Sequence, residues 1–357
     1  MRHSLFSITL LAVQLSACGS TPESPASAED ARGGGAARAD GARGAVPIVI
    51  AHRGASGYLP EHTAEAKVLA HGMGVDFIEQ DVVLTRDGMP IVLHDVEIDT
   101  VTDVAQRFPN RRRANGRWYA IDFTLAEIGS LNVRERIDPR TGNRVFPDRF
   151  TPANVRFGVR TLEEEIALIA GLNVTTRRTT GLYTEIKAPD WHREQGRDVT
   201  RAVLDVLERY ELRKRTDPIW LQCFDPGELL RIRQDLGSDL KLVQLIGDNS
   251  WGDANVDFDK MRTAAGLAEV AKYADGVGVW IPHVVQWPNA GAKPALTTLV
   301  RDAHAAGLKV HVYTLRRDQL PQNAPDFAAV HAALLQAGVD GVFSDFPDES
   351  RALLKPR

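Results

Sequence analysis

Short apolar runs alternate with amphipathic helical stretches along most of the chain, from Val46 onward. This alternation is typical of a parallel sheet whose strands are joined by helical crossovers. The runs that predict strands are Pro47–Ala51, Asp76–Thr85, Leu182–Ile186, Ile219–Gln222, Lys241–Leu245, Gly276–Val279, Lys309–Tyr313 and Gly341–Phe343. The stretches that predict helices include Leu162–Leu172, Asp198–Glu208, Pro226–Leu236, Leu267–Tyr273, Thr298–Ala306 and Asp326–Gln336. Eight such units in order predict an α/β fold of the closed TIM (β/α)₈ barrel type rather than an open sheet.

Two segments interrupt this alternation. Thr85–Gly88 is a turn sequence, and so short a link permits only an antiparallel return strand over Pro90–Leu93. The stretch from Glu97 to Gly158 is rich in Arg, Asp, Pro and Gly, which predicts an insertion after the second strand. We therefore expect one barrel domain over residues 46–357, with a small inserted subdomain at about 97–158.

The first residues predict an export signal. A basic start precedes the apolar run Leu5–Leu15, which is too short to span a bilayer. Residues 15–18, Leu-Ser-Ala-Cys, resemble the lipobox of bacterial lipoproteins, so we expect residues 1–17 to be removed and Cys18 to carry a lipid anchor. Residues 18–45 are rich in Ala, Gly, Ser and Pro and predict a disordered tether. The expected location is the periplasmic face of the outer membrane, with the periplasm and the cell surface as alternatives. An ordinary signal peptide with an incidental Cys is the alternative to the anchor.

Composition and charge narrow the function classes. Hydrophobic residues make up 43% and charged residues 25%, which is ordinary for a globular chain. The formal net charge is -4, and the dense basic run Arg111–Arg113 is too short to follow a nucleic-acid backbone, so no nucleic-acid partner is expected. Cys223 lies in an apolar run and is predicted to be a buried small side chain rather than a nucleophile. The sequence does not indicate an oligomeric state.

Polar residues gather where the predicted strands end. They are His52 and Arg53 after the first strand, Glu79 and Asp81 in the second, Glu185 and Lys187 at the third, and Gln222, Gln244, Trp280, Tyr313 and Asp345 at later strands. The active site of a TIM barrel lies at the C-terminal ends of its strands. We therefore expect these side chains, which are distant in sequence, to meet at one mouth.

Three of these residues are carboxylates, which suggests a metal ion. Side chains alternate along a strand, so Glu79 and Asp81 point to the same side. Together with Glu185 they would repel each other unless a cation neutralised them. Oxygen ligands favour Ca²⁺, or Mg²⁺, over Zn²⁺. In the alternative, the carboxylates pair with Arg53 and Lys187 and no metal binds.

Two histidines are expected at the same mouth. His52 follows the first strand, and counting back from the turn at Thr85–Gly88 places His94 opposite roughly Asp81. Histidines that titrate near neutral pH can act as general base and general acid on a reacting phosphate. The alternative for each is a buried structural histidine.

Several segments together resemble the signature of the glycerophosphodiester phosphodiesterases, in particular their periplasmic bacterial branch. The matching segments are His52–Thr63, Ile78–Asp81, Val92–Asp95, Asp103–Ile128, Glu185–Lys187, Leu221–Asp225 and Phe343–Pro347. The resemblance covers nearly the whole mature chain. It implies a TIM barrel with a small inserted subdomain, and hydrolysis of glycerophosphodiesters to sn-glycerol 3-phosphate and an alcohol such as choline, ethanolamine or glycerol.

The resemblance also implies roles for individual residues. The expected roles are metal binding, with Ca²⁺ as the ion, for Glu79, Asp81 and Glu185; acid–base catalysis for His52 and His94; phosphate contacts for Arg53 and Lys187; and contacts to the alcohol for Phe224 and Trp280. Residues 247–260 and 279–293 do not match the family pattern, so the preferred alcohol stays open. Two alternatives remain: a related phospholipase D, although those enzymes lack the pattern of Asp103–Ile128, and a surface lipoprotein with a binding or adhesion role.

Overall fold

The computed structural model describes residues 46–151, 154–252 and 254–354. The predicted export signal, the predicted anchor residue Cys18 and the predicted tether all lie outside these described residues. Within the described part of the chain, no helix combines the length and the apolar character needed to cross a bilayer.

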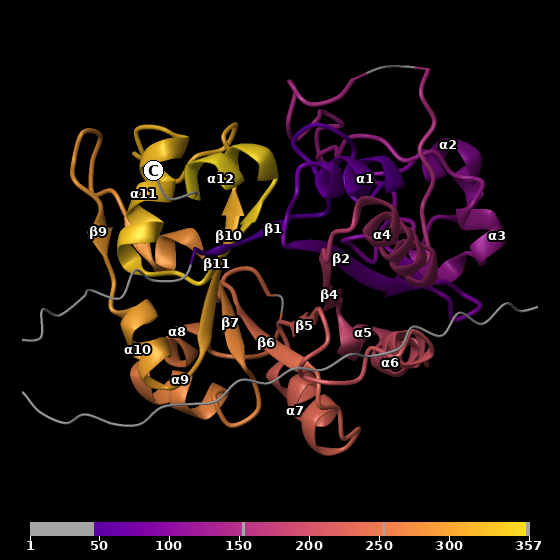
Figure 1. Cartoon of the computed structure of the whole chain (residues 1–357). Coiled ribbons are helices and arrows are strands. Elements are labelled where there is room, and N and C mark those ends of the chain that lie inside the picture. The colour runs from indigo at the N-terminus through magenta and orange to yellow at the C-terminus, as the bar shows by residue number, and fades with distance from the viewer. Residues whose placement is uncertain (1–45, 152–153, 253, 355–357) are drawn as a thin grey trace, which may run out of the picture. The chain divides into compact units, whose positions relative to one another are not determined.

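Eight parallel strands form a closed barrel at the centre of the molecule (Figure 1). They are β1 (Ile48–Ala51), β2 (Phe77–Leu84), β4 (Gly181–Ile186), β5 (Ile219–Cys223), β6 (Lys241–Ile246), β7 (Gly276–Trp280), β10 (Lys309–Leu315) and β11 (Gly341–Ser344). Strand β1 pairs with both β11 and β2, which closes the sheet. The predicted fold class and all eight predicted strands are confirmed.

Helices surround the barrel, and the six predicted ones are present. The helices outside the insertion are α1 (Ala64–Gly72), α4 (Leu162–Thr176), α5 (Pro189–Glu194), α6 (Val199–Arg209), α7 (Pro226–Gln234), α8 (Phe258–Met261), α9 (Ala264–Val270), α10 (Leu299–Ala305), α11 (Phe327–Ala337) and α12 (Pro347–Leu354). Polar side chains fix several starts: Thr161 and Glu164 form a capping box for α4, and Asp225 caps α7. The main apolar core lies between these helices and the strands.

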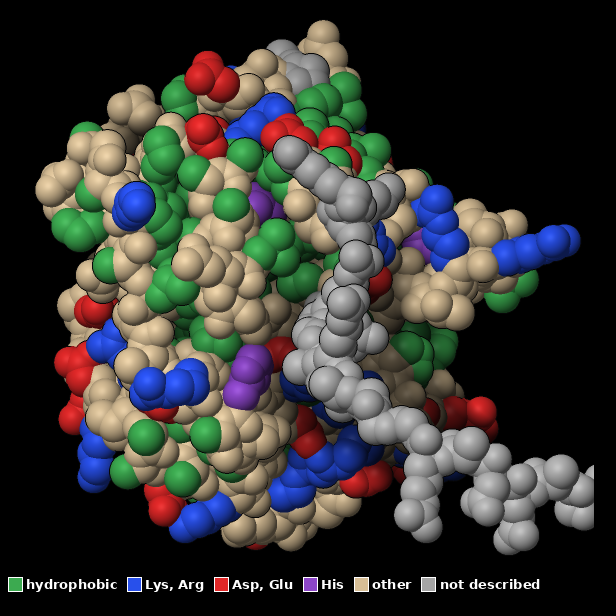
Figure 2. Space-filling view, turned by 60° about the vertical axis from the view of Figure 1, so that its left-hand side comes forward, with side chains coloured by type: hydrophobic (Ala, Val, Ile, Leu, Met, Phe, Trp, Pro, Cys, Tyr) green, Lys and Arg blue, Asp and Glu red, His purple; other side chains and the backbone are tan. Residues whose placement is uncertain are grey.

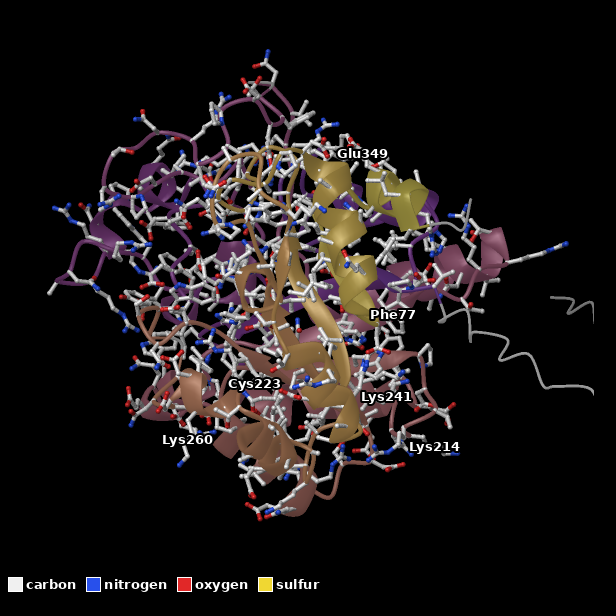
Figure 3. The ribbon with its side chains drawn as sticks, turned by 90° about the vertical axis from the view of Figure 1, so that its left-hand side faces the viewer. Phe77, Lys214, Cys223, Lys241, Lys260 and Glu349 are labelled. Carbon is white, nitrogen blue, oxygen red and sulfur yellow. The ribbon has the colours of Figure 1, made fainter. Side chains whose placement is uncertain are left out.

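The strands all run in one direction through the barrel, which sets the position of the mouth. In Figure 3, Phe77 and Lys241, which begin β2 and β6, lie to the right of Cys223, which ends β5. The mouth therefore opens toward the left of that view. Cys223 itself is 1% exposed, as the sequence predicts for a buried side chain.

Strand β2 extends beyond the barrel. Its pairing with β1 ends at Ala51 and Ile78, but β2 continues to Leu84 and pairs there with the antiparallel strand β3 (Pro90–Val92). The turn between them uses Gly88 with a φ of +79°, a conformation that favours glycine. The predicted hairpin is confirmed. Glu79, however, lies in the middle of β2 and not at its end, because the strands of the barrel are staggered.

The segment between β3 and α4 holds only short elements. These are α2 (Val104–Arg107), the 3₁₀ helices η1 (Pro109–Arg111) and η2 (Ala120–Asp122), and α3 (Leu125–Ile128). In Figure 1, α2 and α3 lie at the edge of the molecule, beyond α1 and α4. Their apolar side chains form a second buried cluster with Val83 and Ile91 of the β2–β3 hairpin. This segment therefore packs on the outer half of the hairpin.

Charges of both signs are mixed on the surface. The face in Figure 2 shows Lys and Arg side chains among Asp and Glu side chains. Within the basic run, Arg111 lies 2.8 Å from Glu127 and Arg113 lies 2.7 Å from Asp122. These acidic partners neutralise Arg111 and Arg113 locally.

Candidate active site

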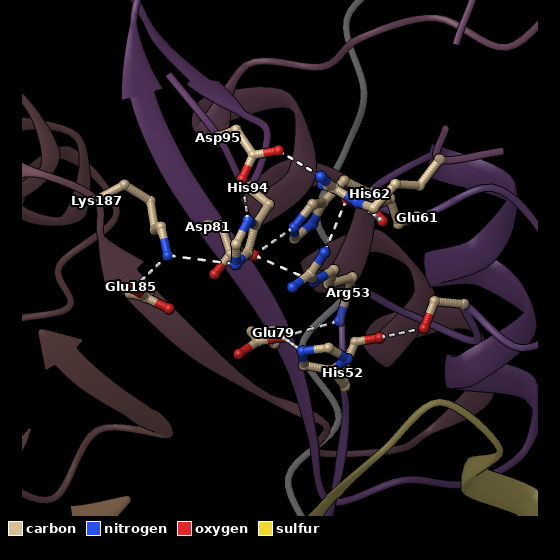
Figure 4. Close-up of polar contacts among 12 residues, drawn as sticks. His52, Arg53, Glu61, His62, Glu79, Asp81, His94, Asp95, Glu185 and Lys187 are labelled. Carbon is tan, nitrogen blue, oxygen red and sulfur yellow. Dashed lines mark hydrogen bonds and ion pairs between the residues drawn. The ribbon is translucent and has the colours of Figure 1, made fainter. Parts of the chain in front are cut away.

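Three buried carboxylates from two neighbouring strands meet at the barrel mouth (Figure 4). Asp81 of β2 is paired in register with Glu185 of β4, and Glu79 lies two residues earlier on the same face of β2. One oxygen from each of the three groups lies within 4.8 Å of the others. The structure thus brings together the three residues that the sequence proposes as metal ligands.

The electrostatics of this triad fit a divalent cation. Burial raises the pKa of Glu79 well above its usual range, and the charges of Asp81 and Glu185 raise it further. Burial also raises the pKa of Glu185 to about 8, although Lys187 opposes the shift. Because a bound cation favours ionised carboxylates, it would remove this penalty. Asp81 Oδ1 is buried without a hydrogen-bond partner, and the set offers only oxygen ligands, which suits Ca²⁺ or Mg²⁺.

His52 is held at the mouth by a carboxylate. This carboxylate is Asp345, the residue that follows β11. His52 Nδ1 lies 2.5 Å from Asp345 Oδ1, and His52 Nε2 lies 3.8 Å from Glu79 Oε2. Arg149 and Arg316 donate to the other oxygen of Asp345 at 2.7 and 2.9 Å. Burial lowers the pKa of His52 to about 4, although Asp345 favours the protonated ring. Nδ1–H therefore donates to Asp345, and Nε2 is free to accept a proton.

His94 has a similar arrangement on the other side of the triad. Its Nδ1 lies 2.5 Å from Asp95 Oδ1, and Lys187 Nζ lies 3.4 Å from its Nε2. The Leu93 amide bonds the Asp81 carbonyl at 2.9 Å, so His94 lies one residue beyond the position opposite Asp81. Burial lowers the pKa of His94 to about 4 as well. The pKa of both rings therefore lies below the neutral range that the sequence predicts, because His52 is buried and because His94, which is partly exposed, loses solvent and faces the cations Arg53 and Lys187.

Two cations complete the polar side of the site. The backbone N–H of Arg53 donates to Glu79 Oε2 at 2.9 Å, and its guanidinium bonds Glu61 at 3.0 Å. Lys187 Nζ donates to Glu185 Oε1 at 2.7 Å. Although burial opposes it, Glu185 raises the pKa of Lys187 above its usual value, so this ammonium stays charged. Two fixed positive charges next to the triad suit a phosphate group.

A cavity of about 880 Å³ joins these groups. Its lining includes all nine residues to which the family resemblance assigns a role. Phe224 and Trp280 lie on a more apolar wall, together with Trp251 and Trp287. A second cavity of about 250 Å³ is lined by Glu61, Arg136, Arg149 and Asp345, among others. The two cavities share His52, Arg53, His94, Arg316 and Gln319.

Gln244 does not join the site. Its Nε2 donates to the Phe224 carbonyl at 2.8 Å, and its Oε1 accepts from the Tyr273 hydroxyl at 2.8 Å. The alternation along β6 directs Leu245, not Gln244, into the cavity. Gln222 does reach the triad, where it donates to Glu79 Oε1 at 2.9 Å. The expectation that both glutamines meet the other site residues is therefore wrong for Gln244.

A chain of buried polar groups connects Asp81 with helices α1 and α4. His62 Nε2 donates to Asp81 Oδ2 at 2.7 Å. Lys67 of α1 lies 3.2 Å from His62 Nδ1 and 3.2 Å from Glu165 Oε2 of α4. Because the ammonium occupies Nδ1, the ring proton lies on Nε2 and faces Asp81. This contact holds the Asp81 carboxylate in the ionised form: burial alone would raise its pKa, but the pKa lies well below the usual range.

Sequence reasoning missed several residues that touch the site. It places Asp345 at a strand end but gives it no role, and it does not find Glu61, Arg136 or Arg149. The last two come from the inserted segment, where no strand or helix pattern could place them. Glu61 lies within the matching segment His52–Thr63, which was the available indication that it belongs to the site.

Comparisons with known proteins agree with this arrangement. The glycerophosphoryl diester phosphodiesterase family model matches residues 52–349. A glycerophosphodiester phosphodiesterase of Haemophilus influenzae is 43% identical over 326 residues, which cover 86% of this chain and 90% of that protein.

Solved structures share the fold. A Silicibacter pomeroyi protein assigned to the glycerophosphoryl diester phosphodiesterases is 26% identical, with a TM-score of 0.66 and coverage of 87% of this chain and 95% of that one. A phosphodiesterase of Oleispira antarctica, solved with the product sn-glycerol-3-phosphate, is 20% identical, with a TM-score of 0.59 and coverage of 87% and 97%. Since the family model spans most of the chain and the Haemophilus enzyme matches nearly end to end, this chain belongs to the glycerophosphoryl diester phosphodiesterase family and is an enzyme of that class.

Proposed function

We propose that this enzyme hydrolyses glycerophosphodiesters such as glycerophosphocholine and glycerophosphoethanolamine, in a metal-dependent reaction that releases sn-glycerol 3-phosphate and the alcohol. The observation that carries the proposal is one cavity in which two carboxylate-bound histidines flank an acidic triad. The Oleispira antarctica enzyme binds sn-glycerol-3-phosphate as its product, which supports the same product here.

The side chains have distinct tasks in this reaction. Arg53 and Lys187 bind and orient the phosphate, since both cations line the cavity beside the triad. One histidine accepts a proton at Nε2 from the attacking oxygen, and a P–O bond forms. The bond from phosphorus to the alcohol oxygen breaks, and the other histidine gives that oxygen a proton. The histidine that serves as acid must carry its proton on Nε2 when the ester is bound.

Glu79, Asp81 and Glu185 would hold the metal ion, which we propose is Ca²⁺. When bound there, a divalent cation supplies positive charge that stabilises the charge developing on the phosphate oxygens. His62 and Gln222 orient two of the three ligands by hydrogen bonds to Asp81 and Glu79.

Metal removal tests the proposal directly. Exhaustive chelation should abolish release of glycerol 3-phosphate from glycerophosphocholine, and Ca²⁺ should restore it better than Zn²⁺. Ca²⁺ should also raise the melting temperature, because it binds the folded protein. Full activity of the chelated protein would contradict metal dependence, while inactivity toward every glycerophosphodiester at saturating Ca²⁺ would contradict the substrate assignment.

We also propose that the protein is exported and held at the periplasmic face of the outer membrane by a lipid on Cys18. The support is the sequence of residues 15–18 and the polar stretch that follows. Replacing Cys18 by Ser should release the protein from the membrane fraction without lowering its activity. Wild-type protein that is purified from membranes and shows no lipid mass would rule out the anchor.

A further inference from the structure

The main cavity has two unlike walls. The carboxylates lie on β2 and β4 and His52 follows β1, whereas the residues of the more apolar wall follow or end β5, β6, β7 and β10, across the barrel from β1. We propose that this second wall binds an apolar alcohol group, so that the enzyme favours glycerophosphodiesters of alkyl alcohols. The inference rests on the proposed function and adds the chemical class of the leaving alcohol.

Tryptophans dominate the proposed alcohol site. The rings of Trp251 and Trp280 pack edge to face with centroids 5.3 Å apart, and Trp287 and Leu320 continue the wall. Trp251 is 42% exposed, which is unusual for so large an apolar side chain. A ligand that covered it would remove apolar surface from water.

The second cavity suits the other end of the substrate. It is lined by guanidinium groups and by the carboxylate of Glu61, which can hydrogen-bond the hydroxyls of a glycerol group. Both histidines lie where the two cavities meet. A phosphate between His52 and His94 would therefore have hydrogen-bonding groups on one side and the tryptophan wall on the other.

A cationic alcohol such as choline fits this wall less well. Among the described residues that form the wall, none carries a carboxylate. A quaternary ammonium group is bound best when aromatic faces surround it, but the Trp251 and Trp280 rings touch each other and leave no slot between them. The Phe224 ring already faces a cation, with Lys187 Nζ 5.8 Å from its centroid.

A series of n-alkyl esters tests the inference. The ethyl, butyl and hexyl esters of glycerol 3-phosphate have leaving groups of similar acidity, so chain length changes mainly the apolar surface that is buried. Each buried methylene should raise kcat/KM by about fourfold, the equivalent of about 0.8 kcal/mol. We expect a gain of at least about tenfold from ethyl to hexyl. A smaller gain, with glycerophosphoglycerol still hydrolysed, overturns this inference alone; no hydrolysis of any ester overturns the proposed function.

Variants at the exposed Trp251 test whether this wall causes the gain in kcat/KM with chain length. The measured quantity is the hexyl-to-ethyl ratio of kcat/KM within each variant, which cancels a general loss of activity. Trp251→Ser should lower the ratio several-fold, whereas Trp251→Leu should largely keep it. Val174→Ser, at a position that is 79% exposed on α4 and outside both cavities, is the matched control and should leave the ratio unchanged. A ratio that Trp251→Ser leaves unchanged overturns the assignment of this wall.

Two further substrates test the orientation of the ester in the cavities and whether the wall binds a cationic alcohol instead. The isomer that carries the hexyl group on the glycerol and ethanol as the alcohol should show no gain, because its chain would meet the polar cavity; an equal gain overturns the orientation. If Trp251→Leu slows glycerophosphocholine but not the hexyl ester, the wall binds cations, and the apolar assignment is overturned.

Discussion

Each histidine of the site is fixed by a carboxylate that has its own arginine partner. Asp345 holds His52 and accepts from Arg149 and Arg316, while Asp95 holds His94 and accepts from Arg136. The two rings therefore present the same nitrogen, Nε2, to the cavity. Their neighbours differ: His52 Nε2 faces Glu79, and His94 Nε2 faces the ammonium of Lys187.

Comparing His52→Ala with His94→Ala should separate base from acid. On glycerophosphocholine, each variant should lose about 10²–10⁴-fold in kcat. On a glycerol phosphodiester with a nitrophenolate leaving group, the variant without the general acid should recover much of its rate, because nitrophenolate departs without a proton. The variant without the base should not recover. A near-wild-type rate in either variant on glycerophosphocholine would remove that histidine from the mechanism.

At the scale of residues, the sequence predicts those parts of the site that lie on strands. Period-two alternation places Glu79 and Asp81 together, and hairpin counting brings His94 to within one residue of its observed position. The support of the site could not be predicted, because Arg149 and Arg316 reach Asp345 from loops. The lowered pKa values of His52 and His94 depend on the loss of solvent around each ring, which is a property of the folded site and not of the local sequence.

Helices α1 and α4 meet around a buried ion pair behind the triad. Lys67 and Glu165 are both 0% exposed, and their charged atoms lie 3.2 Å apart. Burial raises the pKa of Glu165 to about 7, although Lys67 opposes this shift. Removing one partner of such a pair leaves an uncompensated buried charge, whereas replacing both can be nearly neutral.

Lys67→Met should therefore lower the free energy of unfolding by about 3–5 kcal/mol, and Lys67→Met combined with Glu165→Met should regain much of this loss. Urea unfolding measures both effects. The control is Glu163→Gln on the same helix, which breaks an exposed pair with Arg209 and should change stability by less than about 1 kcal/mol. A single Lys67→Met variant as stable as the wild type would show that the ion pair does not contribute to the free energy of unfolding.

At the scale of elements, the alternation of short apolar runs and amphipathic stretches was sufficient to predict the barrel. Parallel strands buried on both faces appear as continuous apolar runs, and caps such as Thr161 mark helix starts. The stagger between strands was not predictable from one strand at a time. It places Glu79 level with the end of β1, although it lies in the middle of β2. The prediction for Gln244 failed because a strand end alone does not say which face a side chain occupies.

At the scale of the whole molecule, the free energy of unfolding should depend on pH. One contribution comes from a buried histidine inside the barrel. His311 is 2% exposed and bonds the Tyr183 hydroxyl at 2.6 Å. Burial lowers its pKa from 6.5 to about 4. Below pH 6.5 the unfolded chain therefore binds a proton that the folded protein does not, so the free energy of unfolding falls as the pH is lowered from 6.5 toward 4.

For this residue alone, the loss between pH 7 and pH 5 should be about 2 kcal/mol. His311→Gln should unfold at a lower urea concentration at pH 7, but its stability should fall less than that of the wild type on going to pH 5. Val174→Ser, at an exposed position on α4 that carries no titratable group, is the control and should keep the wild-type pH dependence. Parallel pH profiles for wild type and His311→Gln would contradict the prediction.

The β2–β3 hairpin carries Glu79, Asp81 and the strand that leads to His94, so a single turn sets the spacing of two metal-binding candidates and one histidine. Inserting or deleting one residue in that turn would leave the strands able to pair but would move every following side chain to the opposite face. His94 would then point into the second apolar cluster instead of the cavity. Within Thr85–Gly88, the exposed Arg86 is therefore open to substitution, whereas the parity of the turn's length is fixed by the site.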